Sequence, residues 1–231
     1  MHSSKSSSDD RADRSFPHLV VDICQGGGQR LDVEMLSRAI NKWRSDADSN
    51  GGLLQRASED QLFTLSLSHF FPLHSGSIMS SEPYIWRSSA TTGGVLWWNV
   101  SDPKVSMPPA VHARTEAALA ESHRLRPLLL SGDFFNLTEV PLANSTGLSP
   151  STTVWTAWQI ASDSCKGAVW AFRREHAAPS TVLSLRNVQP TRRYSVTFSH
   201  NFSTEKLDDA KVLTGAQLQQ LSVELSACSA T

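Results

Sequence analysis

Three consecutive glycines directly follow a short apolar run near the start of this chain, and together these two features limit how the N-terminal segment can fold. The run covers residues 19–23 and is typical of a strand buried on both faces of a parallel sheet. Gly26, Gly27 and Gly28 end that strand. Because glycine lets the backbone turn sharply and approach a ligand closely, the sequence predicts a buried strand that opens into a ligand-facing turn.

A short helix and a second strand are predicted after this turn. Asp32 stands in the position of an N-cap, and apolar residues recur behind it at helical spacing: Val33, Leu36, Ile40 and Trp43. Asp46 then ends the second strand. Ligands of parallel α/β proteins bind at the carboxyl ends of strands, so we expect Cys24, Gly26, Gly27 and Asp46 on one functional face.

These residues resemble the site of glycoside hydrolase family 36, the α-galactosidase group. The resemblance rests first on a block that contains Phe16 to Cys24, Gly26, Gly27, Arg30, Asp32, Glu34, Arg38 and Trp43 to Asp46. It continues in the same order through residues 67–74, 83–88, 132–138, 155–159 and 171–174. The similarity covers about residues 16 to 200, and the first block is the specific one.

The resemblance implies a retaining hydrolase of terminal α-galactosides, which needs two carboxylates and neither cofactor nor metal. Asp46 matches the acid/base that protonates the leaving oxygen, and Trp43 is expected to give it an apolar environment. Cys24, Gly26 and Gly27 match the substrate-binding turn, with Cys24 close to a sugar hydroxyl. Without the resemblance, Asp46 could equally be a helix cap or a loop carboxylate, Cys24 a small buried residue and Gly27 part of an ordinary turn.

Three other acidic residues are predicted to have structural or solvent-facing positions. Asp22 lies inside the first strand and should be hydrogen-bonded there, with Arg44 as the expected partner. Asp32 is expected to form an N-cap and an ion pair with Arg30. Asp48, two residues beyond Asp46, is expected to be a solvated loop residue.

The length of the chain indicates an incomplete barrel. A closed eight-stranded α/β barrel takes about 250 residues, and the whole chain has 231. The predicted class is therefore α/β plus all-β: a disordered start at 1–15, the second half of a (β/α)8 barrel at 16–126, and an antiparallel β-sandwich at 127–231. The family's nucleophile is an Asp of an earlier strand with no match before residue 16, so we expect a C-terminal portion of the enzyme that is inactive alone.

Local patterns predict the remaining elements. Residues 61–71 form a strand or a helix, 84–88 and 94–100 form strands, and 110–126 form a helix that ends at Pro127. Short β-type segments follow at 153–160, 167–174, 181–188 and 194–198, whose spacing favours antiparallel pairing. Trp155, Trp158 and Trp170 are expected to pack in the core of this second part.

Composition excludes several classes of protein. The net charge of −1 gives no electrostatic basis for binding nucleic acid or acidic membranes, and no 18-residue apolar run predicts a membrane span. The three cysteines and eight histidines show no metal-binding spacing. A carbohydrate is the expected partner, and a homo-oligomer of the full-length enzyme stays open.

Four sequons, at Asn99, Asn136, Asn144 and Asn201, suggest a secretory or lysosomal route, although a chain rich in Ser and Thr also generates sequons by chance. Two hypotheses of different classes are compatible with the sequence. One is the α-galactosidase-like enzyme, including the related α-N-acetylgalactosaminidases and raffinose-type galactosyltransferases. The other is a noncatalytic carbohydrate-binding or remnant protein.

Overall fold

The structure is a computed structural model of the chain. It describes residues 15–16, 18, 21–29, 32–37, 39, 41–46, 53–71, 73–96, 107–140, 152–163, 165–202 and 210–225. Within these residues the protein is a mixed α/β structure with one parallel sheet and several antiparallel ladders.

The N-terminal part contains a four-stranded parallel sheet in the order β1-β2-β3-β4. Its strands are β1 (Asp22–Ile23), β2 (Asn41–Trp43), β3 (His74–Ile78) and β4 (Gly94–Leu96). Two short helical turns, α2 (Gln25–Gly28) and α3 (Val33–Leu36), connect β1 to β2. The predicted succession of strand, glycine turn, helix and strand is therefore present, but the helix ends at Leu36 and Trp43 lies in β2, outside the helical spacing predicted for it. The N-cap of α3 is confirmed, because Asp32 Oδ1 accepts a hydrogen bond of 2.9 Å from Met35 N.

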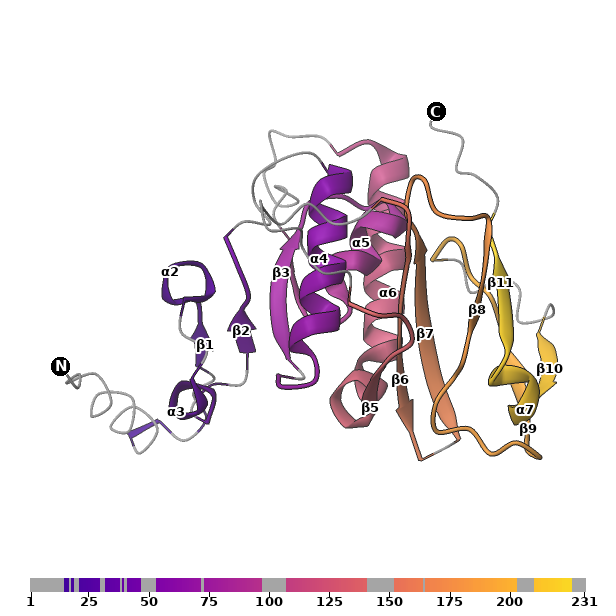
Figure 1. The fold of residues 1–231 in the computed structure, drawn as a ribbon. Coiled ribbons are helices and arrows are strands. Elements are labelled where there is room, and N and C mark those ends of the chain that lie inside the picture. The colour runs from indigo at the N-terminus through magenta and orange to yellow at the C-terminus, as the bar shows by residue number, and fades with distance from the viewer. Residues whose placement is uncertain are drawn as a thin grey trace.

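Three longer helices form the middle layer of the molecule. They are α4 (Leu53–Leu67), α5 (Pro83–Ala90) and α6 (Pro109–Ser131). Figure 1 shows these helices between the parallel sheet on one side and the antiparallel strands on the other. None of the helices in the described ranges has both the length and the apolar composition needed to cross a membrane.

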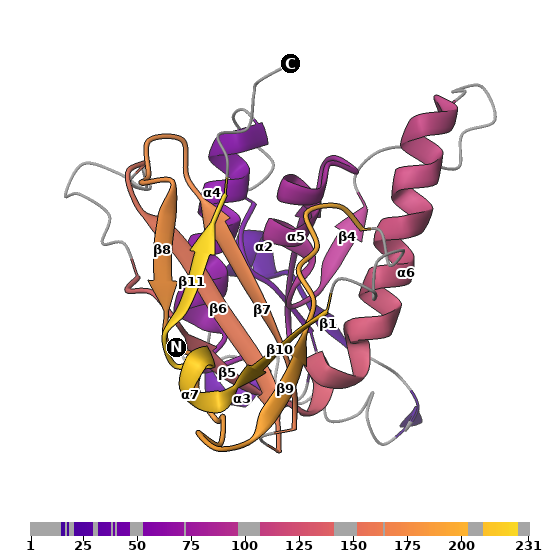
Figure 2. The ribbon, with the colours of Figure 1, turned by 90° about the vertical axis from the view of Figure 1, so that its right-hand side faces the viewer.

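The C-terminal part is antiparallel throughout the described strands. A three-stranded sheet in the order β5-β6-β7 consists of β5 (Asp133–Asn136), β6 (Trp155–Ser162) and β7 (Lys166–Arg173). Two further ladders pair β8 (Ser180–Leu183) with β11 (Leu221–Glu224), and β9 (Arg193–Val196) with β10 (Lys211–Thr214). The short helix α7 (Gly215–Leu218) stands between β10 and β11, as Figure 2 shows from the side.

One hydrophobic cluster joins the middle helices to the antiparallel sheet. Leu65 of α4 packs with Trp158, Ile160, Trp170 and Phe172 of β6 and β7, and Leu125, Leu128 and Leu129 of α6 cover them. The Trp158 and Trp170 rings stack with centroids 6.4 Å apart. The predicted core role of Trp155, Trp158 and Trp170 is confirmed, because each side chain is buried.

One predicted element and one predicted helix boundary are wrong. Residues 84–88 belong to helix α5 and not to a strand, because Pro83 at the first position starts a helix whose buried face contains Ile85, Trp86, Ser88 and Ser89. The helix predicted to end at Pro127 continues through it to Ser131. Pro127 lacks only its own N–H, and beyond it Gly132 N donates to Leu128 O at 2.8 Å, which restores helical hydrogen bonding. The division of the chain near residue 127 stays a prediction.

Two of the four sequons lie in the described residues. Asn201 is exposed. Asn136 is half-buried in β5, where its Nδ2 donates a hydrogen bond of 3.2 Å to Leu65 O. A glycan is attached through this same nitrogen and replaces one of its two hydrogens, so a glycan on Asn136 would leave one N–H for this contact between β5 and α4.

Candidate active site

The glycine turn has the backbone conformation that only glycine adopts without strain. Gly26, Gly27 and Gly28 have φ of 63°, 78° and 82°. The turn is closed by a hydrogen bond of 2.9 Å from Gly28 N to Cys24 O. Cys24 itself is exposed and not part of a disulfide, so it is not the small buried residue of the alternative interpretation.

The structure brings Asp46 against this turn. A Cβ atom on Gly27 would lie 2.8 Å from both Cγ and Oδ2 of Asp46, so the absence of a side chain at Gly27 makes room for the carboxylate. Trp43 Nε1 donates a hydrogen bond of 2.7 Å to Asp46 Oδ1. Since β1 and β2 are parallel, with Ile23 opposite Lys42, the turn and the carboxylate share the carboxyl end of the sheet.

The environment of Asp46 differs from the expected one. Asp46 is exposed, and Trp43 contributes a hydrogen-bond donor as well as an apolar ring. The physical effect is to orient one carboxylate oxygen rather than to desolvate the group. Asp48 and Arg30 lie outside the described residues.

Replacing Gly27 by alanine should separate Asp46 from the turn. The new methyl group needs the space of the carboxylate, and a positive φ costs a residue with a side chain about 1–2 kcal/mol. Gly26→Ala is the matched control, because its φ is also positive but the nearest atom to its Cβ would be 3.7 Å away on Gln29. We expect both variants to lose a similar amount of unfolding free energy because of the strained backbone. Gly27→Ala should lose more than Gly26→Ala, because its methyl group also displaces Asp46. Urea unfolding measures both losses. Equal destabilisation of Gly27→Ala and Gly26→Ala would show that Asp46 does not pack closely against Gly27.

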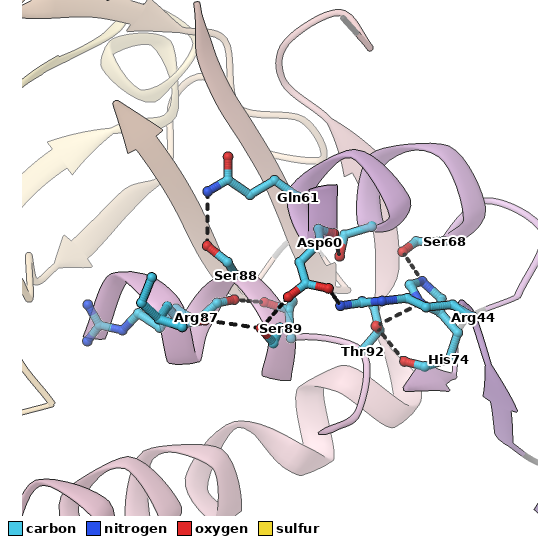
Figure 3. A network of polar contacts seen from close by, with 12 residues as sticks. Arg44, Asp60, Gln61, Ser68, His74, Arg87, Ser88, Ser89 and Thr92 are labelled. Atoms are coloured by element: carbon cyan, nitrogen blue, oxygen red, sulfur yellow. Dashed lines mark hydrogen bonds and ion pairs between the residues drawn. The ribbon is translucent and has the colours of Figure 1, made fainter. Parts of the chain in front are cut away.

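The side chain of Arg44, the residue after Trp43, points into the protein interior. Arg44 is buried and forms an ion pair with Asp60 of α4, and Asp60 also accepts a hydrogen bond from Ser89 of α5. Figure 3 shows this chain of contacts running from the end of β2 to the two helices. The predicted pair of Asp22 and Arg44 is wrong, because Asp22 is exposed and Asp60 takes the guanidinium.

A buried histidine lies next to this ion pair. Thr92 Oγ1 donates to His74 O at 2.7 Å and therefore has no second proton for His74 Nδ1, 3.2 Å away. Nδ1 must donate to Thr92, and Nε2 must accept from Ser68 Oγ at 3.1 Å. The ring is thus held as one neutral tautomer. Burial, with the positive charge of Arg44 in addition, lowers the pKa of His74 to about 3.

This histidine should make the protein acid-sensitive. Its ordinary pKa of 6.5 applies in the unfolded chain, so between pH 6.5 and about 3 the unfolded state binds one proton more than the folded state. Stability should therefore fall by about 1.4 kcal/mol per pH unit on acidification through this window. His74→Asn should flatten the dependence measured by urea unfolding from pH 6.5 to 4.5. His112→Asn, at an exposed position of α6, should leave the slope unchanged.

Sequence reasoning missed Lys42. Its side chain is buried, with 1% of its surface exposed, and Nζ has no hydrogen-bond partner within the described structure. Burial lowers the pKa of Lys42, and the electrostatic interactions with Cys24, Asp22 and Asp32 act in the opposite direction. Elsewhere in the described residues, no group of three or more His, Cys, Asp or Glu side chains could hold a metal ion.

Comparison with solved structures identifies the fold. Three crystal structures of the family 36 α-galactosidase AgaA from Geobacillus stearothermophilus superpose with TM-scores of 0.70, 0.68 and 0.71 at 19%, 20% and 20% sequence identity. One contains 1-deoxygalactonojirimycin and another contains stachyose. No family model matches the sequence. No curated protein matches it either.

The superpositions cover very different fractions of the two chains. Each superposition covers 95% of this chain and 28% of the AgaA chain, so this chain spans less than a third of the protein that it resembles. The chain has a fold like that of a glycoside hydrolase of this family. At this identity the likeness concerns the fold alone.

Proposed function

We propose that this chain provides the acid/base part of a retaining glycoside hydrolase site that acts on terminal α-galactosides. The observation that carries the proposal is the contact of Asp46 with Trp43 and Gly27 at the carboxyl end of parallel strands. Open α/β sheets and barrels bind their ligands at this end. The likeness of the fold to an α-galactosidase supports the same class of reaction.

The exposure and the orientation of Asp46 are compatible with the acid/base role. In a retaining reaction a carboxyl group first gives its proton to the glycosidic oxygen and then takes a proton from the attacking water. Asp46 is exposed and can exchange that proton with solvent, while the Trp43 indole holds Oδ1 in a fixed direction. In this proposal Cys24, Gly26 and Gly27 contact the sugar, since the glycine turn lies directly beside the carboxylate.

The proposal places the second carboxylate, the nucleophile, on polypeptide other than these 231 residues. The parallel strands β1 to β4 would belong to the second half of a (β/α)8 barrel, and the antiparallel strands to a C-terminal β-sandwich. α-N-Acetylgalactosides and raffinose-type transfer are alternative substrates and reactions for the same acid/base. A noncatalytic carbohydrate-binding protein is the alternative of a different class.

The purified chain alone should therefore hydrolyse no aryl α-galactoside, because loss of one member of a catalytic pair costs several orders of magnitude in turnover. Release of nitrophenol from a nitrophenyl α-galactoside measures this directly. Turnover near 1 per second or faster, typical of complete enzymes, would show that the chain contains its own nucleophile. Co-expression with barrel strands that contain the nucleophile should restore turnover, whereas a noncatalytic binding protein would stay inactive in that assembly.

A further inference from the structure

We propose that Asp60 of α4 is a positioning residue for the Asp46 site, acting through Arg44. The inference rests on the proposed role of Asp46 and extends it to a residue that does not touch the substrate side of the sheet. Trp43 and Arg44 are neighbours in sequence, but Trp43 contacts Asp46 whereas the Arg44 side chain is directed to the helix layer (Figure 3). The arginine thus connects the end of β2 to α4 and α5.

The Arg44 side chain is held on several sides. Its guanidinium pairs with Asp60, lies 5.8 Å from the centroid of the Phe63 ring, and packs against the backbone of Gly76. A Cβ on Gly76 would lie 2.2 Å from Arg44 Nη2, so a side chain at this position of β3 would displace the guanidinium. Ser89 completes the arrangement by donating a hydrogen bond to the second oxygen of Asp60.

The main chain of Arg44 links the same contacts to the glycine turn. Arg44 N donates a hydrogen bond of 3.1 Å to Ser75 O in β3. On the other side, a Cβ on Gly28 would lie 2.3 Å from Arg44 O, so the turn packs directly on this carbonyl. A shift of Arg44 would therefore move Asp46, two residues along the chain, and the turn beside it.

The stability of the folded state does not by itself explain why the ion pair of Arg44 and Asp60 is buried. Well-packed apolar residues of similar volume often replace such a pair without loss of stability, whereas a pair can fix one arrangement of the chain. The double variant R44M/D60L separates these two roles, because it removes both charges and puts apolar side chains in their place. If the ion pair is merely structural, the contact between Trp43 and Asp46 should persist in this variant. If the ion pair positions the site, that contact should be lost.

The indole N–H of Trp43 reports the position of Asp46 without any assay of activity. The chain has seven tryptophans, so indole ¹⁵N labelling gives seven signals, and Trp43→Phe identifies one of them. This signal should move with pH as Asp46 titrates, and Asp46→Asn should abolish the movement. In R44M/D60L we expect the movement to be lost while the signals of the buried tryptophans of the antiparallel sheet keep their positions.

The matched control is R87M/E121L, which removes the ion pair of 2.8 Å between α5 and α6. It should leave the pH-dependent movement of the Trp43 signal as it is in the native chain. If R44M/D60L does not fold, Ser89→Ala decides, because it removes only one donor to Asp60 and should reduce the movement. A native movement in R44M/D60L, or in Ser89→Ala, would overturn the proposal. Absence of glycosidase activity in every assembly would reject the proposed function and leave this result intact.

Discussion

Replacing Asp60 by alanine should cost about 3–5 kcal/mol of unfolding free energy, the range for breaking a buried ion pair by removing one partner. The expectation follows from burial, since the exposed fractions of the Arg44 and Asp60 side chains are 0% and 2%. Asp60→Ala removes the carboxylate that the buried guanidinium contacts. It also leaves Ser89 without its acceptor on Asp60. Urea unfolding followed by far-UV circular dichroism measures the loss.

The contrast with a surface pair makes this prediction specific. Arg114 and Glu82 form an ion pair of 2.8 Å whose side chains are 43% and 53% exposed. Water solvates these charges in both states, so Glu82→Ala should cost less than about 1 kcal/mol. A similar small cost for Asp60→Ala would mean that Arg44 reaches solvent when its partner is absent.

The local arrangement of the candidate site could be predicted from the sequence because it depends on residues close together in the chain. Three glycines after an apolar run require a turn, and the Asp32 cap limits the helix that follows. The parallel pairing of β1 and β2 then puts Asp46 beside Gly27. Each step depends on neighbours within about one strand and one helix, where backbone preferences decide the structure.

The partner of Arg44 could not be predicted in the same way. Asp22 is the expected partner because a carboxylate inside a buried strand needs a hydrogen-bonding partner. The observed partner lies on α4, where Asp60 and Thr64, with Ser68 directly after the helix, form a buried polar stripe at four-residue spacing. A polar helical stripe normally indicates a solvent-facing surface, and only the tertiary structure shows that this one is buried.

The sequence pattern does not predict strand β3, for a related reason. Its sequence, from His74 to Ile78, contains two serines and a glycine, and such residues are depleted in strands or neutral. All five residues are nevertheless buried. Gly76 makes room for Arg44 and His74 is held by Thr92 and Ser68, so the strand is specified by its contacts and not by its own β-propensity.

Helix α5 shows the opposite error. Tyr84, Ile85 and Trp86 favour a strand by propensity, yet Pro83 starts a helix there. That helix buries Trp86 in a cluster with Ile78, Ala118 and Phe202. Burial on one helical face outweighs the local preference, because the apolar area removed from water exceeds the small differences in propensity.

In an assembly that contains the nucleophile, Asp46→Asn should lower turnover of natural α-galactosides by about 10²–10⁴-fold, the usual contribution of a general acid/base. The amide keeps the size of the side chain and can still contact Trp43, so the loss reflects the missing proton transfer. Asp48→Asn, two residues along the chain, is the control and should keep native turnover. Steady-state rates with a natural α-galactoside measure both variants.

Loss of rate alone does not identify an acid/base, but the dependence on the leaving group does. An activated aryl galactoside needs little protonation, so Asp46→Asn should still form the β-galactosyl enzyme quickly and then hydrolyse it slowly. Azide, which needs no general base, should attack the anomeric carbon from the opposite face, break the bond to the nucleophile and release α-galactosyl azide. Rescue of turnover by azide together with this product would establish the role of Asp46. If Asp46→Asn left natural and activated substrates equally fast, its contact with Trp43 and Gly27 would be structural only.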